Sequence, residues 1–131
     1  MKGVRREEPD SSEGQLGEDF HHPKCFAISN DEARLTLHAK RMKEPLKTFA
    51  KAFSHSEEHV SRVSQFAEKE DVCEARLIML ETGFSKFEMA QLLNFCPASV
   101  DEAWRLVPSL KRADPRTLSD ALEVINEYRK P

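Results

Sequence analysis

Residue types that could support catalysis are present, but their spacing assembles no known catalytic or metal-binding motif. His55 and His59 lie four residues apart, which places both on one face of a helix. Ser56 occupies the position where a zinc-protease motif has its glutamate. Cys96 precedes Pro97 in apolar surroundings, which raise rather than lower the pKa of a thiol. We therefore expect no catalytic residue, no cofactor and no bound metal, and the chain is predicted to be an interaction module rather than an enzyme.

Charge and glycine content give little support for a nucleic-acid or nucleotide site. The 131 residues include 20 basic and 23 acidic side chains, a net charge of −3, and only four glycines, too few for a glycine-rich phosphate loop. Basic residues concentrate in one place, between residues 40 and 51. This cluster is typical of a solvated helix face or, alternatively, of a patch that contacts phosphates.

Length and hydropathy predict a single soluble domain. A chain of this length can enclose one core, and no apolar run approaches the roughly 20 residues needed to cross a bilayer. Cys25, Cys73 and Cys96 stand far apart and form no C-x-x-C pair, so we expect neither disulfides nor structural zinc. The expectation is an intracellular protein without membrane association.

The first part of the chain lacks the apolar residues of a core. Residues 1–19 are polar and contain Gly, Pro and Ser, so we expect them to be disordered in the isolated chain. Apolar residues return between residues 20 and 37, but without a periodicity long enough to close a core. Such a segment is typical of an arm that lies against a partner.

Two local patterns compete in the second half of this arm. Ser29 and Glu32 have the spacing of a capping box, which favours a helix over residues 31–41. Leu35 and Leu37, however, alternate with polar residues as in a strand. The sequence leaves both possibilities open.

From residue 45 onward the apolar periodicity is helical, and no run supports a β-sheet core, so the predicted fold class is all-α. Pro45 suits a first helical turn, and Ser56 and Thr117 can cap helices. The helix near residues 70–82 is apolar almost all round, which predicts the central element. The expected helices are 45–53, 56–67, 70–82, 86–95, 100–107 and 117–128.

The junction after residue 82 is the most strongly specified position in the chain. Gly83 can adopt a left-handed conformation that ends a helix at little steric cost. Ser85 and Glu88 have the spacing of a capping box, and Phe84 precedes Met89 by the five residues of a hydrophobic staple. One aromatic ring is therefore predicted to clamp two helices together.

The same junction carries a resemblance to a known family. Residues 83–97 read G-F-S-K-F-E-M-A-Q-L-L-N-F-C-P, followed by D-E-A at 101–103 and L-V-P-S-L at 106–110. They resemble the C-terminal signature of the fourth-largest subunit of RNA polymerase II and its archaeal counterpart: K-F-E-x-A-x-L-x-x-L-C-P-E-T-x-E-E-A, closed by I-P-S-L. Residues 16–20, L-G-E-D-F, resemble the family's L-G-x-E-F, so the resemblance spans most of the chain.

This resemblance implies a fold and a role. Residues 1–43 would form the tail and the partner-docking arm, and residues 44–131 a helical bundle similar to the helicase-and-RNase-D C-terminal (HRDC) module. The chain would be a non-catalytic subunit in the nucleus that forms a heterodimer with the seventh subunit. That partner carries an oligonucleotide-binding barrel, so RNA would be contacted mainly through it, in a stalk beside the RNA exit path of the polymerase core. The candidate partner-binding residues are Leu16, Phe20, Phe26, Leu35 and Leu37.

Six further residues are candidates for holding the helical domain together. They mark the helix ends and the buried apolar positions of the signature. They are Gly83, Phe84, Phe87, Cys96, Pro97 and Pro108.

Departures from the family pattern bear on which polymerase is involved. Ala98 replaces the usual acid after Cys-Pro, and Lys111 and Arg112 stand where the polymerase II form tends to have an acid and a glycine. A paralogue serving a specialised enzyme, such as RNA polymerase III or the plant RNA-silencing polymerases that direct DNA methylation, is as compatible with these residues as polymerase II.

A second resemblance starts from Gly83 and Phe84. A G-F loop between helices is similar to the ubiquitin-associated domain, in which this loop helps to hold ubiquitin. It covers residues 72–108 only. The exposure of the Phe84 ring separates the two interpretations, because a buried staple cannot bind a ligand.

Overall fold

The structure, a computed structural model, describes residues 27–131. Within this range every regular element is helical, which confirms the all-α prediction, and no helix there is long and apolar enough to span a membrane. Residues 31–41, for which helix and strand were both possible, are helical. The elements are α1 (Asn30–Lys43), α2 (Lys51–Arg62), α3 (Lys69–Met79), α4 (Lys86–Phe95), α5 (Val100–Leu106), the 3-10 helix η3 (Pro108–Arg112) and α6 (Pro115–Tyr128).

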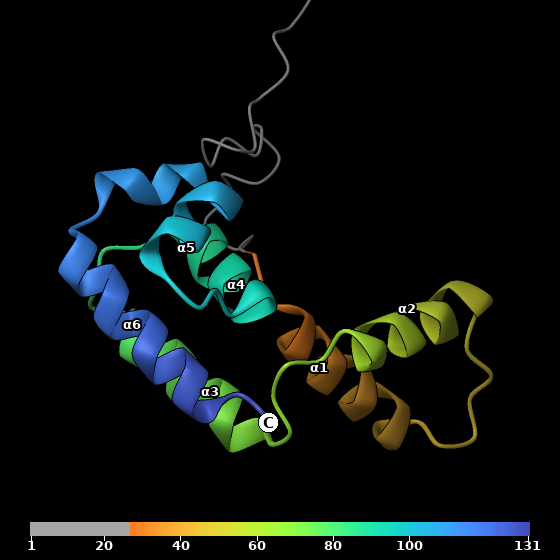
Figure 1. The fold of residues 1–131 in the computed structure, drawn as a ribbon. Helices are drawn as coiled ribbons and strands as arrows, with labels where there is room; N and C mark the ends of the chain where they lie inside the picture. The colour runs from red at the N-terminus through yellow and green to blue at the C-terminus, as the bar shows by residue number, and fades with distance from the viewer. Residues whose placement is uncertain (1–26) are drawn as a thin grey trace, which may run out of the picture.

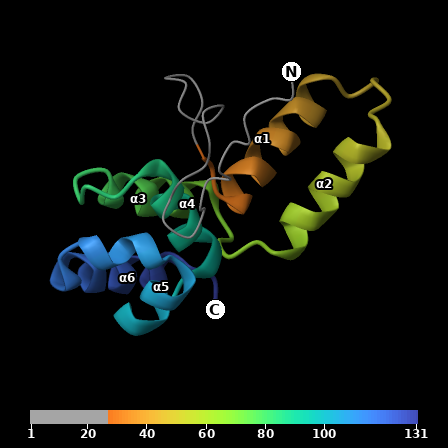
Figure 2. The same cartoon turned by 90° about the horizontal axis from the view of Figure 1, so that it is seen from above.

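The helices form two parts. Helices α3 to α6 make a body in which α3 contacts α6 and α4, and α5 contacts α6 and η3. Helices α1 and α2 form a hairpin that extends away from this body (Figures 1 and 2). The predicted domain boundary between residues 43 and 44 falls at the end of α1, inside the hairpin. That boundary, and the likeness of residues 44–131 to the HRDC module, stay predictions.

One hydrophobic core fills the body and takes no member from α1 or α2. Burying each large apolar side chain contributes about 1.5–3 kcal/mol, so this cluster dominates the stability of the body. Helix α6 supplies one of its faces with residues three and four apart, as the sequence predicts. This face consists of Leu118, Ala121, Leu122 and Ile125, with Tyr128 packed at its edge.

The junction between α3 and α4 has the predicted geometry. Gly83 adopts φ +83°, the left-handed region that favours glycine. The Ser85 hydroxyl accepts from the N–H of Glu88 at 3.1 Å, and the Glu88 carboxylate accepts from the N–H of Ser85 at 2.8 Å, which is a complete capping box. Phe84 is 6% exposed and belongs, with Met89, to the core cluster.

Glu88 also links α4 to η3, a role that the sequence did not reveal. Its side chain is 1% exposed and accepts hydrogen bonds from the hydroxyl of Ser109 at 2.6 Å and from the guanidinium of Arg112. These partners lie more than 20 residues away, and they satisfy a carboxylate that would be costly to bury alone. The capping residue is therefore also a tertiary anchor.

Of the two helix starts after Pro97, the first lacks a complete capping box and the second lies before the expected cap at Thr117. At α5, the Ser99 hydroxyl accepts from the N–H of Glu102 at 3.2 Å, but the Glu102 carboxylate accepts from Ala98 instead of closing a capping box. Helix α6 begins at Pro115 rather than at Thr117. Proline suits the first turn because the missing N–H has no helical partner there.

The segment around residues 44–50 contradicts the expected helix starts. Pro45 begins no helix, and Ser56 lies inside α2, which starts at Lys51. The helical spacing of Phe49 and Phe53 was misleading, because these two rings stack on each other at 4.3 Å between centroids instead of facing the core. Apolar residues four apart predict proximity, but not burial.

Candidate partner-docking surfaces

The hairpin is held to the body at the first turn of α1. Asp31 is 1% exposed, and its carboxylate accepts from the N–H of Gln65 at 2.9 Å and from the hydroxyl of Ser64 at 2.5 Å. The guanidinium of Arg34 lies 3.4 Å from the same carboxylate. This buried anion ties the start of α1 to the segment that joins α2 to α3.

Arg76 of α3 forms the second attachment. Its guanidinium pairs with Glu32 at 2.9 Å and donates to the carbonyl of Ala27 at 3.1 Å. The N–H of Asn30 donates to the side-chain oxygen of Asn94 in α4 at 2.7 Å. Residues 27–30, where the described part of the chain begins, therefore lie directly beside α3 and α4.

The interior of the hairpin is poorly enclosed. The buried residues of its two helices are Asp31 in α1 and Val60 in α2. Leu35 and Leu37, two of the predicted partner-binding residues, are half-buried on α1. The other three residues of that set, Leu16, Phe20 and Phe26, lie outside the described residues.

Arg41 organises the outer half of the hairpin. Its guanidinium donates from Nε to both carboxylate oxygens of Glu57, at 3.0 and 2.9 Å, and lies 4.9 and 5.4 Å from the ring centroids of Phe49 and Phe53. The hydrogen bonds from Arg41 hold the pKa of Glu57 below its usual value. Ion pair and cation–π contacts thus connect α1, the loop and α2.

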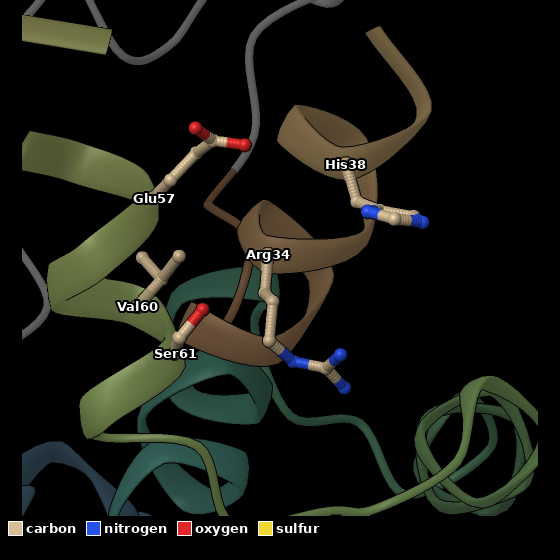
Figure 3. A pocket seen from close by; sticks show the side chains of 5 residues that line it. All are labelled: Arg34, His38, Glu57, Val60 and Ser61. Atoms are coloured by element: carbon tan, nitrogen blue, oxygen red, sulfur yellow. The ribbon is translucent and has the colours of Figure 1, made fainter. Parts of the chain in front are cut away.

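A small pocket lies between the two helices of the hairpin. Its volume is about 130 Å³, and Figure 3 labels the residues that line it, Arg34 and His38 on α1 and Glu57, Val60 and Ser61 on α2. No hydrogen bond joins Ser61 to His38 in the described part of the chain. Residues 27–131 also hold no group of three potential metal ligands. The pocket therefore offers no nucleophile paired with a base.

Helix α3, which the sequence predicted to be the central element, contacts α1, α4 and α6 but leaves one apolar stripe exposed. Cys73, Leu77 and Leu80 follow one another at intervals of four and three residues, and the two leucines are 56% and 55% exposed. Arg76, next to Leu77, is mostly covered by its contacts with Glu32 and Ala27, and Ile28 is 43% exposed. The stripe therefore adjoins the point where the chain enters the described region. Only the opposite face of α3 enters the core.

The six predicted structural residues lie in the body and its turns. Phe84 and Cys96 are core members, Phe87 packs against the core and Pro97 is buried. Gly83 is exposed in its turn, and Pro108 begins η3 half-buried.

Cys96 is a structural thiol. It ends α4 with φ +44°, and burial raises its pKa to about 11. At neutral pH it stays protonated, so it is a poor nucleophile.

The buried ring of Phe84 bears directly on the ubiquitin-associated interpretation. That interpretation needs a G-F loop that is free to hold a ligand, whereas Phe84 is 6% exposed and packs in the core cluster. The geometry gives no support to a ubiquitin-binding loop here.

The comparisons with known proteins agree with the first resemblance. A family model described as RNA polymerase Rpb4 matches residues 27–129. A protein of Arabidopsis thaliana named DNA-directed RNA polymerase II subunit 4 is 32% identical over 111 residues, which cover 80% of this chain and 79% of the relative. A Dictyostelium discoideum protein named DNA-directed RNA polymerase II subunit rpb4 is 29% identical over 94 residues, covering 72% of this chain and 58% of the relative. With the matched region extending over nearly all of the described helices, the chain belongs to the RNA polymerase Rpb4 family.

Proposed function

We propose that this chain is a non-catalytic stalk subunit of a nuclear DNA-dependent RNA polymerase. It forms a heterodimer with a seventh-subunit-type protein that carries an oligonucleotide-binding barrel, near the RNA exit path. It contacts RNA mainly through that partner and joins the polymerase core as part of the pair. Family membership and the names of the relatives support an assignment to transcription.

One observation carries the heterodimer proposal. The body encloses a complete core, whereas the hairpin leaves Leu35 and Leu37 half-buried and has one buried apolar residue in its two helices. An amphipathic element without a full covering is typical of a surface that a partner chain completes. Leu16, Phe20 and Phe26 extend the same partner-binding set toward the N-terminus.

The α3 stripe extends this surface. Arg76 of α3 donates to the carbonyl of Ala27 at 3.1 Å, and Leu77 and Leu80 follow it in the chain, so a partner that contacts the chain near residue 27 would lie close to both leucines. Both leucines are more than half exposed, and covering them would add apolar area to the interface. The barrel-containing partner is the occupant that we propose for the stripe.

Co-expression with the barrel-containing partner tests the proposal. We expect the two full-length chains to purify together as a one-to-one complex. Two double variants, Leu35→Ser/Leu37→Ser and Leu77→Ser/Leu80→Ser, should each weaken the complex by about tenfold or more, roughly 1.4 kcal/mol of binding free energy. Isothermal titration of the purified chains gives the dissociation constants.

Leu106→Ser supplies the matched control. Leu106 lies on α5 and is 41% exposed, so its loss removes a comparable exposed leucine from another surface. Circular dichroism checks that each variant keeps its helical content. A fully ordered monomer that ignores the partner, or equal weakening by the control variant, would reject the proposal.

A further inference from the structure

The end of the hairpin farthest from the body presents exposed apolar side chains among basic ones. We name residues 40–51 the hairpin tip; Figures 1 and 2 both place it away from the helices of the body. Within the tip, Leu46 is 98% exposed and Met42 is 65% exposed. Neither side chain is buried among the described residues 27–131, although both lie within a few residues of an ordered turn.

The tip is braced from inside. The rings of Phe49 and Phe53 stack at 4.3 Å, Arg41 lies against both, and the ammonium of Lys47 lies 5.6 Å from the Phe49 centroid. The N–H of Lys47 donates to the carbonyl of Glu44 at 3.2 Å. An ordered turn therefore presents the Leu46 side chain to solvent. Little conformational entropy would be lost when this side chain enters a pocket of a binding partner.

The charge of the tip is strongly unbalanced. Residues 40–51 contain five basic side chains and one acidic side chain, in a protein whose net charge is −3. Glu44 is shared by Lys40 and Lys47, at 3.3 and 3.6 Å. Among the described residues, no ion pair involves Lys43 or Lys51, and both are exposed.

We propose that the hairpin tip is a second docking site, which binds an acidic protein segment containing apolar side chains. Lys43 and Lys51 would pair with carboxylates of that segment, and Leu46 with Met42 would contact its apolar residues. The opposite charges would orient the acidic segment on the tip and raise its association rate constant. The apolar contacts would lower its dissociation rate constant. This site lies at the end of the hairpin beyond Leu35 and Leu37, and its test below does not use the heterodimer partner.

The side chains of the tip favour a protein over RNA as the occupant. Single-stranded RNA is bound largely by stacking of bases on open aromatic faces. Phe49 of the tip and Phe53 of α2 are half-buried and stack on each other beneath Arg41. The large apolar side chains that stay exposed in the tip, Met42 and Leu46, are not aromatic and offer no stacking surface for bases.

Binding of defined probes to the full-length chain tests the inference. Fluorescence anisotropy would compare a short peptide that alternates Asp or Glu with Leu or Phe, the same peptide with Ser at every apolar position, a Lys-substituted peptide and single-stranded RNA. We expect the acidic apolar peptide to bind best. Leu46→Ser and Lys43→Glu/Lys51→Glu should each weaken its binding by about tenfold or more, because one removes the apolar contact and the other reverses the free cations.

Lys111→Glu/Arg116→Glu is the matched control, because it reverses two exposed basic residues of the body. It should change peptide affinity by less than about twofold, the scale of a long-range charge effect in physiological salt. Equal affinity for the apolar and Ser-containing acidic peptides would overturn the proposal. So would RNA binding that is tighter than peptide binding and depends on the lysines but not on Leu46. Absence of peptide binding would overturn it as well.

Discussion

Phe84 connects two helices with one ring, since it follows the turn at Gly83 and precedes the cap of α4. Replacement by Ala removes the ring from the core and leaves a cavity where Met89 packs in the same cluster. We expect Phe84→Ala to lower the free energy of unfolding by about 3–5 kcal/mol. Urea denaturation followed by circular dichroism measures the change.

Leu46→Ala is the control. Because Leu46 is 98% exposed, this substitution should alter the free energy of unfolding by less than about 0.5 kcal/mol. Equal effects of the two variants would refute the clamp.

The thiols of Cys73 and Cys96 should differ sharply in reactivity. Burial raises the pKa of Cys96 to about 11, whereas Cys73 is exposed on α3. At pH 8 alkylation of Cys96 in the folded protein should therefore be slower than that of Cys73 by about 100-fold or more. Peptide mass spectrometry after timed labelling with iodoacetamide resolves the two sites. Comparable rates would mean that Cys96 is accessible.

The raised pKa of Cys96 also gives a pH dependence of stability. The unfolded thiol ionises near pH 9, and the folded thiol near pH 11. Between these values the unfolded state holds fewer protons, so this residue should make the protein less stable as the pH rises from about 9 to about 11. Urea midpoints at several pH values, compared with those of Cys96→Ala, isolate the contribution. A difference between the two proteins that does not change with pH would contradict it.

The role of a residue was predictable from the sequence where its hydrogen-bond partner lies within one helical turn of it. The capping boxes of Ser29 and Ser85 follow from spacing alone, because each donor and acceptor pair is three residues apart. The long-range role of Asp31 was not predictable, since its partners Ser64 and Gln65 lie more than 30 residues away. Arg76 and Glu32 are 44 residues apart and carry no local signal.

At the scale of elements, the buried carboxylate of Asp31 makes one of the two attachments of the hairpin to the body. Asp31→Ala would leave the N–H of Gln65 and the hydroxyl of Ser64 without that acceptor, at a cost of about 1–3 kcal/mol. We expect faster amide exchange in α1 and α2, with α3 to α6 unchanged. Hydrogen–deuterium exchange with mass spectrometry measures both regions. Asp101→Ala, an exposed acid on α5, is the control. Faster exchange throughout the body would show that the two parts unfold together.

The existence of most helices was predictable, but their boundaries and exposure were less so. Pro45 fits a first helical turn in isolation, yet the chain forms a loop there because Phe49 and Phe53 stack outside the core. The apolar content of α3 predicted a central helix, whereas Leu77 and Leu80 stay exposed. Periodicity reports which residues are apolar, and it cannot distinguish a surface buried by this chain from one available to another chain.

At the scale of the whole molecule, the family was predictable because its signature combines irregular features. The Cys-Pro stop, the following Glu-Ala pair and the Pro-Ser-Leu exit occur together in residues 96–110, and the match to the RNA polymerase Rpb4 family confirms the resemblance. The docking surfaces were less predictable. They depend on the angle at which the hairpin leaves the body, which the buried contacts of Asp31 and Arg76 set.

Binding of the proposed barrel-containing partner should stabilise the hairpin selectively. A ligand that binds only the folded state adds about 2.7 kcal/mol at a concentration 100 times its dissociation constant. Because the core of the body is already enclosed, new protection should appear in α1 and α2 and around Leu77 and Leu80, but not in α5 or α6. Hydrogen–deuterium exchange of the chain with and without its partner measures this pattern. Protection confined to α5 and α6 would instead place the partner on the opposite part of the molecule, and the hairpin surface would then need another occupant.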